Sequence, residues 1–166
     1  MKNVAVIVGR FQAHKLTDGH KELINYVISK CDKLIIFVGV YPKAPNFKHP
    51  LPFEMREWML LEFIPSYYIV SHNVKIIPIY DVFNIPLWSE NLDKKVDELT
   101  SNDDNVTLYG SRDSFIFNYN GKYKTEEIES HGDSSATDLR NEIKNMDIRN
   151  VEEEFRKGII WALRNT

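Results

Sequence analysis

The stretch VAVIVGRFQAHKLTDGHKELI, residues 4–24, decides the fold. A continuous apolar run from Val4 to Val8 predicts a buried strand, which ends at the segment GRFQ, residues 9–12. Thr17 then precedes an amphipathic pattern that predicts a helix. The first N–H groups of a helix have no intrahelical partner and carry the positive end of its dipole. This turn is therefore suited to bind an anion such as a nucleotide phosphate.

Similar apolar runs recur along the chain and alternate with helical patterns. Strands are predicted at residues 4–8, 34–40, 74–80 and 106–109, and helices after Thr17, after Pro52, over 92–99, from Ser135 and over 151–164. The alternation predicts an α/β fold, a Rossmann-like doubly wound parallel sheet. We expect one domain over residues 1–166, with a C-terminal helical part from about residue 135. The irregular segment 117–133 is predicted to form a hairpin or a mobile flap.

The composition limits the classes of function. The chain has 166 residues, of which 43% are hydrophobic, and a formal net charge of -3. This balance gives no reason to expect nucleic acid or an anionic membrane as a partner. The single cysteine, Cys31, excludes an intramolecular disulfide, and no apolar run approaches the length of a membrane span. We therefore expect a soluble, cytoplasmic protein, and homo-oligomer formation stays open.

Three motifs carry a family resemblance. The chain lacks the GxxxxGK[ST] and GxGxxG phosphate loops but has GRFQ at 9–12, TDGH at 17–20 and SSATDLR at 134–140. This combination resembles the nucleotidylyltransferase superfamily, with its [HT]xGH and SxTxxR signatures, and within it the nicotinamide mononucleotide adenylyltransferases. HPLPFEMR, DVFNIPLW and LYGSRDSF, at 49–56, 81–88 and 108–115, resemble further segments of that family in the same order.

The resemblance implies an enzyme of NAD biosynthesis that transfers the adenylyl group of ATP to nicotinamide mononucleotide and releases pyrophosphate. Such a reaction needs anion positioning and charge neutralisation rather than a covalent nucleophile. Mg²⁺ would arrive with ATP, since the sequence has no metal-ligand spacing of its own. Two alternatives stay open: a related transferase that acts on phosphopantetheine or a polyol phosphate, and a non-catalytic nucleotide sensor.

The resemblance also implies a set of ATP-side residues. His20 would hydrogen-bond the α-phosphate with Thr17, Arg10 and Arg140 as further catalytic groups. Two of these residues have a plainer alternative: His20 as a helix residue that caps or packs, and Arg140 as a solvated side chain behind an ordinary capping box. Asp113 is an equally good N-cap of a helix near Ser114. The full ATP-side set is Gly9, Arg10, Phe11, Thr17, Gly19, His20, Gly110, Ser111, Asp113, Ser135, Thr137 and Arg140.

The acceptor side is implied by the same resemblance and comprises Gln12, Gly39, Arg56, Asp81, Asn84 and Trp88. We interpret Trp88 as a residue of a polar loop whose ring stacks on the nicotinamide, with a core position as the alternative. For Arg56 the alternative is a solvated helix face. The chain departs from the family pattern at Ala13, which replaces a proline, at the added His14 and Lys15, and at His49-Pro50-Leu51. Lys15 as a phosphate ligand, His14 as the missing first histidine and an exposed insertion all stay open.

Overall fold

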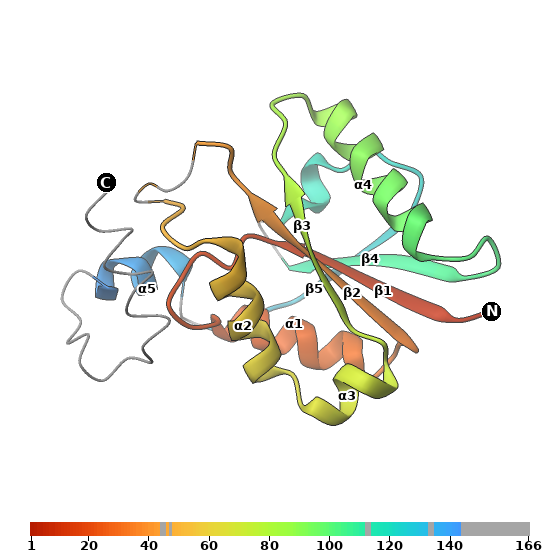
Figure 1. The fold of residues 1–166 in the computed structure, drawn as a ribbon, viewed down its shortest axis with the longest axis horizontal. Helices are drawn as coiled ribbons and strands as arrows, with labels where there is room; N and C mark the ends of the chain where they lie inside the picture. Colours follow the sequence, from red (N-terminus) through yellow and green to blue (C-terminus); the bar gives the residue numbers. More distant parts are fainter. Residues whose placement is uncertain (44–45, 47, 112–113, 133–134, 144–166) are drawn as a thin grey trace.

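The computed structural model describes residues 1–43, 46, 48–111, 114–132 and 135–143. Its centre is one sheet of five parallel strands in the order β3-β2-β1-β4-β5 (Figure 1). The strands are β1 (Asn3–Gly9), β2 (Lys33–Val40), β3 (Lys75–Tyr80), β4 (Asn105–Ser111) and β5 (Lys124–Ile128). The predicted α/β fold with a doubly wound parallel sheet is confirmed, and β1 lies at its middle.

Helices cover both faces of the sheet (Figure 1). On one face lie α1 (Asp18–Ile28), α2 (Phe53–Phe63) and α3 (Ser66–Ser71), and on the other lie α4 (Ile85–Leu99) and the 3-10 helix η1 (Phe115–Asn118). The central strand β1 contributes to two cores because successive side chains point to opposite faces. Ala5 and Ile7 belong to the α1 and α2 side, whereas Val4, Val6 and Val8 pack with α4.

The helix α1 begins where the sequence predicts it. The Thr17 hydroxyl accepts from the N–H of His20 at 3.2 Å, and His20 Nδ1 accepts from the N–H of Thr17 at 3.2 Å. This reciprocal pair is a capping box in which an imidazole replaces the usual carboxylate or amide. The apolar face predicted for this helix is buried against the sheet: Leu23, Ile24, Val27 and Ile28.

Two expectations about the middle of the chain are wrong. The helix predicted over 92–99 begins at Ile85, because Asn84 caps it by accepting from the N–H of Leu87 at 3.0 Å. Trp88 therefore lies in the first turn of α4 rather than in a loop. The segment 117–133 is not a hairpin in its described part, since β5 pairs in parallel with β4. The short helix α3 was also not expected.

The predicted helix at Ser135 is confirmed as α5 (Ala136–Ile143), with the Ser135 hydroxyl accepting from the N–H of Asp138 at 3.1 Å. It lies beyond one end of the sheet (Figure 1). The helix expected over 151–164 lies outside the described residues. Among the helices that the structure describes, none has the length and apolar character needed to cross a bilayer.

Candidate functional site

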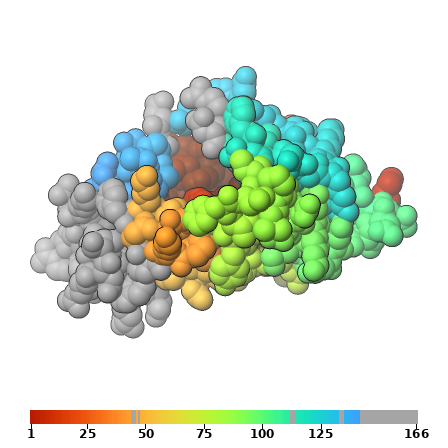
Figure 2. All heavy atoms as spheres, turned by 90° about the horizontal axis from the view of Figure 1, so that it is seen from above, coloured from red at the N-terminus to blue at the C-terminus, as the bar shows by residue number. Residues whose placement is uncertain are grey.

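A cavity of about 640 Å³ opens at the carboxyl end of the sheet, a volume typical of a small-molecule site. Figure 2 shows the hollow with N-terminal residues on its floor and the 40s, 80s, 110s and α5 around it. Ten predicted site residues line it, although they come from five separate parts of the chain. They are Gly9, Arg10, Phe11, Gln12, His20, Gly39, Asp81, Trp88, Ser111 and Arg140.

Other predicted site residues lie beside the cavity without lining it: Thr17, Gly19, Arg56, Asn84, Gly110, Ser135 and Thr137. A Cβ on Gly19 would lie 2.8 Å from the Ser130 hydroxyl, so this glycine allows close packing against the segment after β5. A Cβ on Gly110 would overlap the Ser114 hydroxyl, which caps η1. Asp113 lies outside the described residues, and Ser114 holds the N-cap position considered for it.

His20 is the best-defined polar group of the cavity. Because Nδ1 accepts from the N–H of Thr17, the hydrogen of the neutral ring resides on Nε2. Burial lowers the pKa of His20 to about 4, so the ring is neutral near pH 7. The histidine therefore caps α1, as the plainer interpretation has it, and also offers an N–H donor to a ligand in the cavity.

The guanidinium of Arg56 lies beneath the cavity and is 1% exposed. Its Nη1 donates to the carbonyls of Arg10 and Gly39 at 2.7 and 2.6 Å, and its Nε donates to that of Pro52 at 3.3 Å. Desolvation lowers the pKa of Arg56 to about 10. The interpretation of Arg56 as a solvated residue is wrong: its side chain braces the loops after β1 and β2.

Gln12 has a comparable supporting position. Its amide oxygen accepts from the N–H of Leu51 at 2.9 Å, and its amide nitrogen donates to the Leu51 carbonyl at 3.0 Å. The side chain is 3% exposed, so both polar ends of the amide are already used inside the protein. This pair of hydrogen bonds ties the GRFQ loop to the start of α2.

Two more arginines border the cavity with different partners. Arg10 Nη1 forms an ion pair with Asp81 at 2.6 Å, which joins the loops after β1 and β3. Arg140, from α5, donates to the Gln12 carbonyl at 3.0 Å and to the Thr137 hydroxyl at 3.1 Å, and burial lowers its pKa. Both side chains therefore place positive charge beside the cavity.

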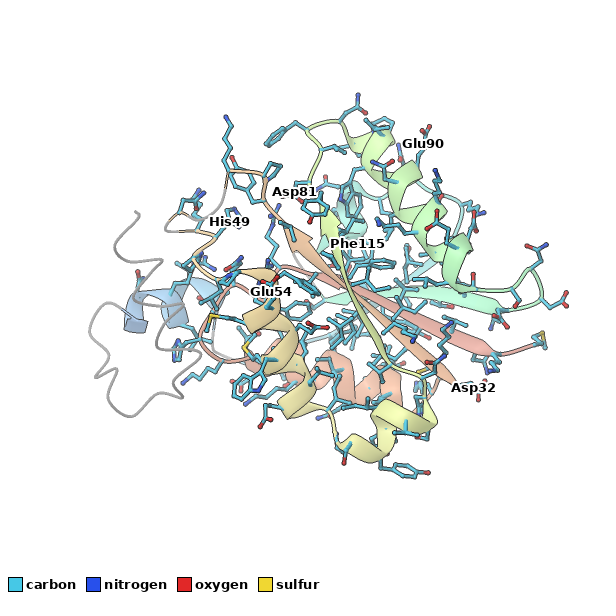
Figure 3. The ribbon with its side chains drawn as sticks, viewed as in Figure 1. Asp32, His49, Glu54, Asp81, Glu90 and Phe115 are labelled. Carbon is cyan, nitrogen blue, oxygen red and sulfur yellow. The ribbon has the colours of Figure 1, made fainter. Side chains whose placement is uncertain are left out.

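Aromatic rings form the rest of the lining. The ring of Trp88 lies 6.1 Å from that of Phe115, and both line the cavity while packing on the α4 core. Figure 3 shows Phe115, His49 and Asp81 around this end of the sheet. The core position considered as the alternative for Trp88 therefore holds in part, and its ring also lines the cavity, whereas its stacking on nicotinamide stays a prediction.

The sequence analysis missed a second group of rings. His49 stacks on Tyr41 with centroids 4.6 Å apart, and Tyr41 meets Phe83 edge to face at 6.1 Å. All three line the cavity, and burial lowers the pKa of His49 to about 4. The sequence signals for them were the positions of Tyr41 and Phe83 shortly after β2 and β3, where a parallel sheet gathers its ligand-binding loops, and the place of His49 at the start of HPLPFEMR.

The residues that follow GRFQ, at the position of the insertion, do not line the cavity. Ala13 is buried and Lys15 is exposed, and neither they nor His14 line the cavity.

No group of three or more His, Cys, Asp or Glu side chains in the described part of the chain is arranged to hold a metal ion. Acidic residues at the cavity are few, and the Asp81 carboxylate is already paired with Arg10.

Comparison with known proteins relates this site to a family. No protein-family model matches the chain. A nicotinamide-nucleotide adenylyltransferase of Sulfurisphaera tokodaii is 34% identical over 89 residues, 54% of this chain and 51% of that protein. A nicotinamide/nicotinic acid mononucleotide adenylyltransferase of Acinetobacter baylyi is 28% identical over 164 residues, 96% of this chain and 84% of the relative. The chain thus spans about half the length of the first of these relatives.

A solved structure shares the fold. It is a bifunctional NMN adenylyltransferase/ADP ribose pyrophosphatase from Francisella tularensis, complexed with AMP and a manganese ion. It superposes with a TM-score of 0.73 at 24% identity and covers 87% of this chain and 42% of that one. The resemblance that the motifs predict is confirmed: in sequence and in fold, this chain is similar to the nicotinamide mononucleotide adenylyltransferases.

Proposed function

We propose that this chain transfers the adenylyl group of ATP to nicotinamide mononucleotide and releases NAD and pyrophosphate. The observation that carries the proposal is that one cavity gathers His20, Arg10 and Arg140 beside the ring of Trp88. Donors and positive charge suit a triphosphate, and an aromatic wall suits a planar pyridinium ring. The sequence similarity to adenylyltransferases supports the same substrates.

The chemistry requires little covalent participation by the protein. A phosphate oxygen of the mononucleotide forms a bond to the α-phosphorus of ATP, while the bond from that phosphorus to the bridging β-oxygen breaks. The leaving pyrophosphate takes the electron pair of the broken bond. Charge grows on the oxygens in the transition state, so fixed hydrogen-bond donors lower the barrier.

His20 is assigned the transition-state donor in this proposal. Its Nε2–H would meet an α-phosphate oxygen, and the capping bond from Thr17 fixes the tautomer that makes this possible. Because the pKa of the His20 imidazolium is about 4, the ring is neutral near pH 7, and a neutral imidazole retains its remaining N–H hydrogen, so it acts as an electrostatic stabiliser rather than as an acid. Thr17 is thereby assigned a positioning role in addition to the phosphate contact implied by the resemblance.

The two flanking arginines are assigned to the substrates' phosphates. Arg140 lies in the last turn of α5 and donates back to Thr137 near the helix start, so its guanidinium and the helix N-terminus at Ser135 together favour the β- and γ-phosphates. Arg10 would exchange its ion pair with Asp81 for a substrate phosphate, and Asp81 would then be available to the acceptor. Trp88 would stack on the nicotinamide with Asn84, Gly39 and Gln12 supporting the surrounding loops.

Magnesium belongs to the ATP substrate in this proposal. The described residues offer no carboxylate cluster for a resident ion, which fits an ion that bridges phosphates and keeps most of its waters. The cation would offset charge on the β- and γ-phosphates beside Arg140.

The test is a direct assay. The purified chain is incubated with ATP, Mg²⁺ and nicotinamide mononucleotide, and NAD and pyrophosphate are quantified together. We expect equimolar products, and a fall in kcat of about a hundredfold or more for His20→Ala, as for the loss of a transition-state donor. His72→Ala is the matched control, since His72 ends α3 away from the cavity. Nucleotide binding without any product would favour the sensor, and pyrophosphate release with another phosphate acceptor would favour the related transferase.

A further inference from the structure

The backbone of Phe11 is held in a conformation that phenylalanine rarely adopts. Its φ is 51°, and among the described residues only Asn73, at 42°, is another non-glycine with positive φ. Asparagine tolerates this region, whereas a bulky side chain there costs on the order of 1–2 kcal/mol. The structure around Phe11 must compensate for that cost, and its side chain shows how.

The Phe11 ring is folded back into the protein and is 2% exposed. A Cβ on Gly9 would lie 2.8 Å from the tip of this ring, so the ring occupies the space that the glycine leaves. Phe11 belongs to the same buried core as Leu16 and Leu23, beside α1. The strained backbone thus delivers an aromatic ring to one fixed place between β1 and α1.

That place is against His20. The centroids of the two rings are 4.8 Å apart with their planes at 55°, a favourable tilted aromatic contact. The imidazole is therefore held on two sides, by the Phe11 ring and by the hydrogen bond from Thr17 to Nδ1. We infer that Phe11 is a positioning residue that fixes the orientation of the His20 ring, and thereby maintains the Thr17 hydrogen bond that selects its tautomer, an inference that rests on the proposed function of His20.

The lowered pKa of His20 agrees with this assignment. The lowered pKa of His20 has burial as its cause, and Phe11 supplies part of that burial. The charged or titratable groups around the same cavity are Arg10, Tyr41, Lys48, His49, Asp81 and Arg140, and none of them contributes to the shift. The polar residues next to His20 in the sequence, at the start of α1, are Thr17, Asp18, Lys21 and Glu22. Removing the ring is therefore expected to return water to the imidazole and to raise its pKa toward the ordinary value.

The experiment compares Phe11→Leu and Phe11→Gly in the full chain. Leucine keeps an apolar side chain and the strained φ, whereas glycine removes the ring and the strain together. In histidine-labelled protein, ring chemical shifts against pH report both the pKa of His20 and its tautomer. We expect the pKa to rise by one unit or more in both variants, with a mixture of tautomers, and kcat to fall about ten- to a hundredfold with little change in the KM for ATP.

Phe63→Leu is the matched control because Phe63 packs against the same core from α2. The Phe63→Leu variant should have a lower free energy of unfolding, whereas the ring chemical shifts of His20 should stay as in the wild type. A wild-type pKa and tautomer for His20 in folded Phe11→Leu and Phe11→Gly would overturn the inference, as would equal effects of Phe63→Leu. The two claims fail separately: a wild-type chain that makes no NAD refutes the function, whereas the spectra test the contact.

Discussion

Replacing Arg56 by methionine tests whether this buried residue supports the site or contacts substrate. Methionine fills similar space but donates no hydrogen bond, so the carbonyls of Arg10 and Gly39 lose their donors at 2.7 and 2.6 Å. A buried carbonyl left without a partner costs about 1–3 kcal/mol. Two of them would cost about 4 kcal/mol, from which the relief of a buried charge is subtracted.

The lowered pKa of Arg56, about 10, shows that its hydrogen bonds do not fully offset the desolvation of its charge. We therefore expect Arg56→Met to reduce the free energy of unfolding by roughly 2–4 kcal/mol, or about 5–15 °C in Tm for a chain of this size. Thermal and urea unfolding measure this directly. Lys94→Met, an equivalent change on the exposed face of α4, should shift Tm by about 1 °C or less.

The opposite pattern would refute the reasoning. If Arg56→Met unfolds like the wild type but raises the KM for a substrate, the guanidinium contacts substrate, as the family resemblance implies. Arg56→Lys sharpens the distinction, since lysine keeps the charge but cannot present the same planar fork to three carbonyls. A supporting role predicts that lysine does not restore stability, whereas a purely electrostatic role predicts that it does.

Three further predictions concern other parts of the molecule. Trp88→Ala should raise the KM for nicotinamide mononucleotide about tenfold with a smaller change for ATP, and equal changes would exclude a stacking role. Below pH 6.5 the unfolded chain protonates His20 while the folded chain resists until about pH 4, so His20 should account for about 3 kcal/mol of lost stability across that window, and His49, whose pKa is also lowered to about 4, adds to the fall. Urea midpoints at stepped pH measure the total, and His20→Gln should reduce the pH dependence by the share of His20 while leaving that of His49. Tyr119→Phe removes a hydrogen bond to Asp93 and should cost about 1 kcal/mol, as read from the same unfolding curves.

The sequence predicted best the elements with a strong apolar pattern. The strands β1 to β4 contain continuous apolar or β-branched runs, and α1 has both a capping box and a clear apolar face, so local signals agree with the fold. The strand β5, KTEEI, has no fully buried residue and is mostly polar, so it lacks such a pattern. The start of α4 was missed because apolar residues there are exposed, among them Ile85 and Leu87.

The candidate site was predictable only in part for a related reason. Parallel topology brings every strand's carboxyl end to one edge, so residues that follow strands could be grouped without knowing their contacts. The buried roles of Arg56 and Gln12 could not be predicted, since they depend on hydrogen bonds to backbone carbonyls and amides of distant loops. Such partners are backbone atoms, which any sequence supplies, and they leave no pattern.

The two guanidinium groups that hold the GRFQ loop have a consequence for the order of folding. The Arg10 carbonyl is held by a residue 46 positions later in the chain, and the Gln12 carbonyl by one 128 positions later. The second separation exceeds the 102 positions between Asn3 and Asn105, which pair in β1 and β4, so the Arg140 contact closes a longer loop than any strand pairing and is expected to form after the sheet. The sheet can therefore assemble before the candidate site is complete. During refolding, tertiary fluorescence should recover ahead of nucleotide affinity, with the docking of α5 as the final step that shapes the loop.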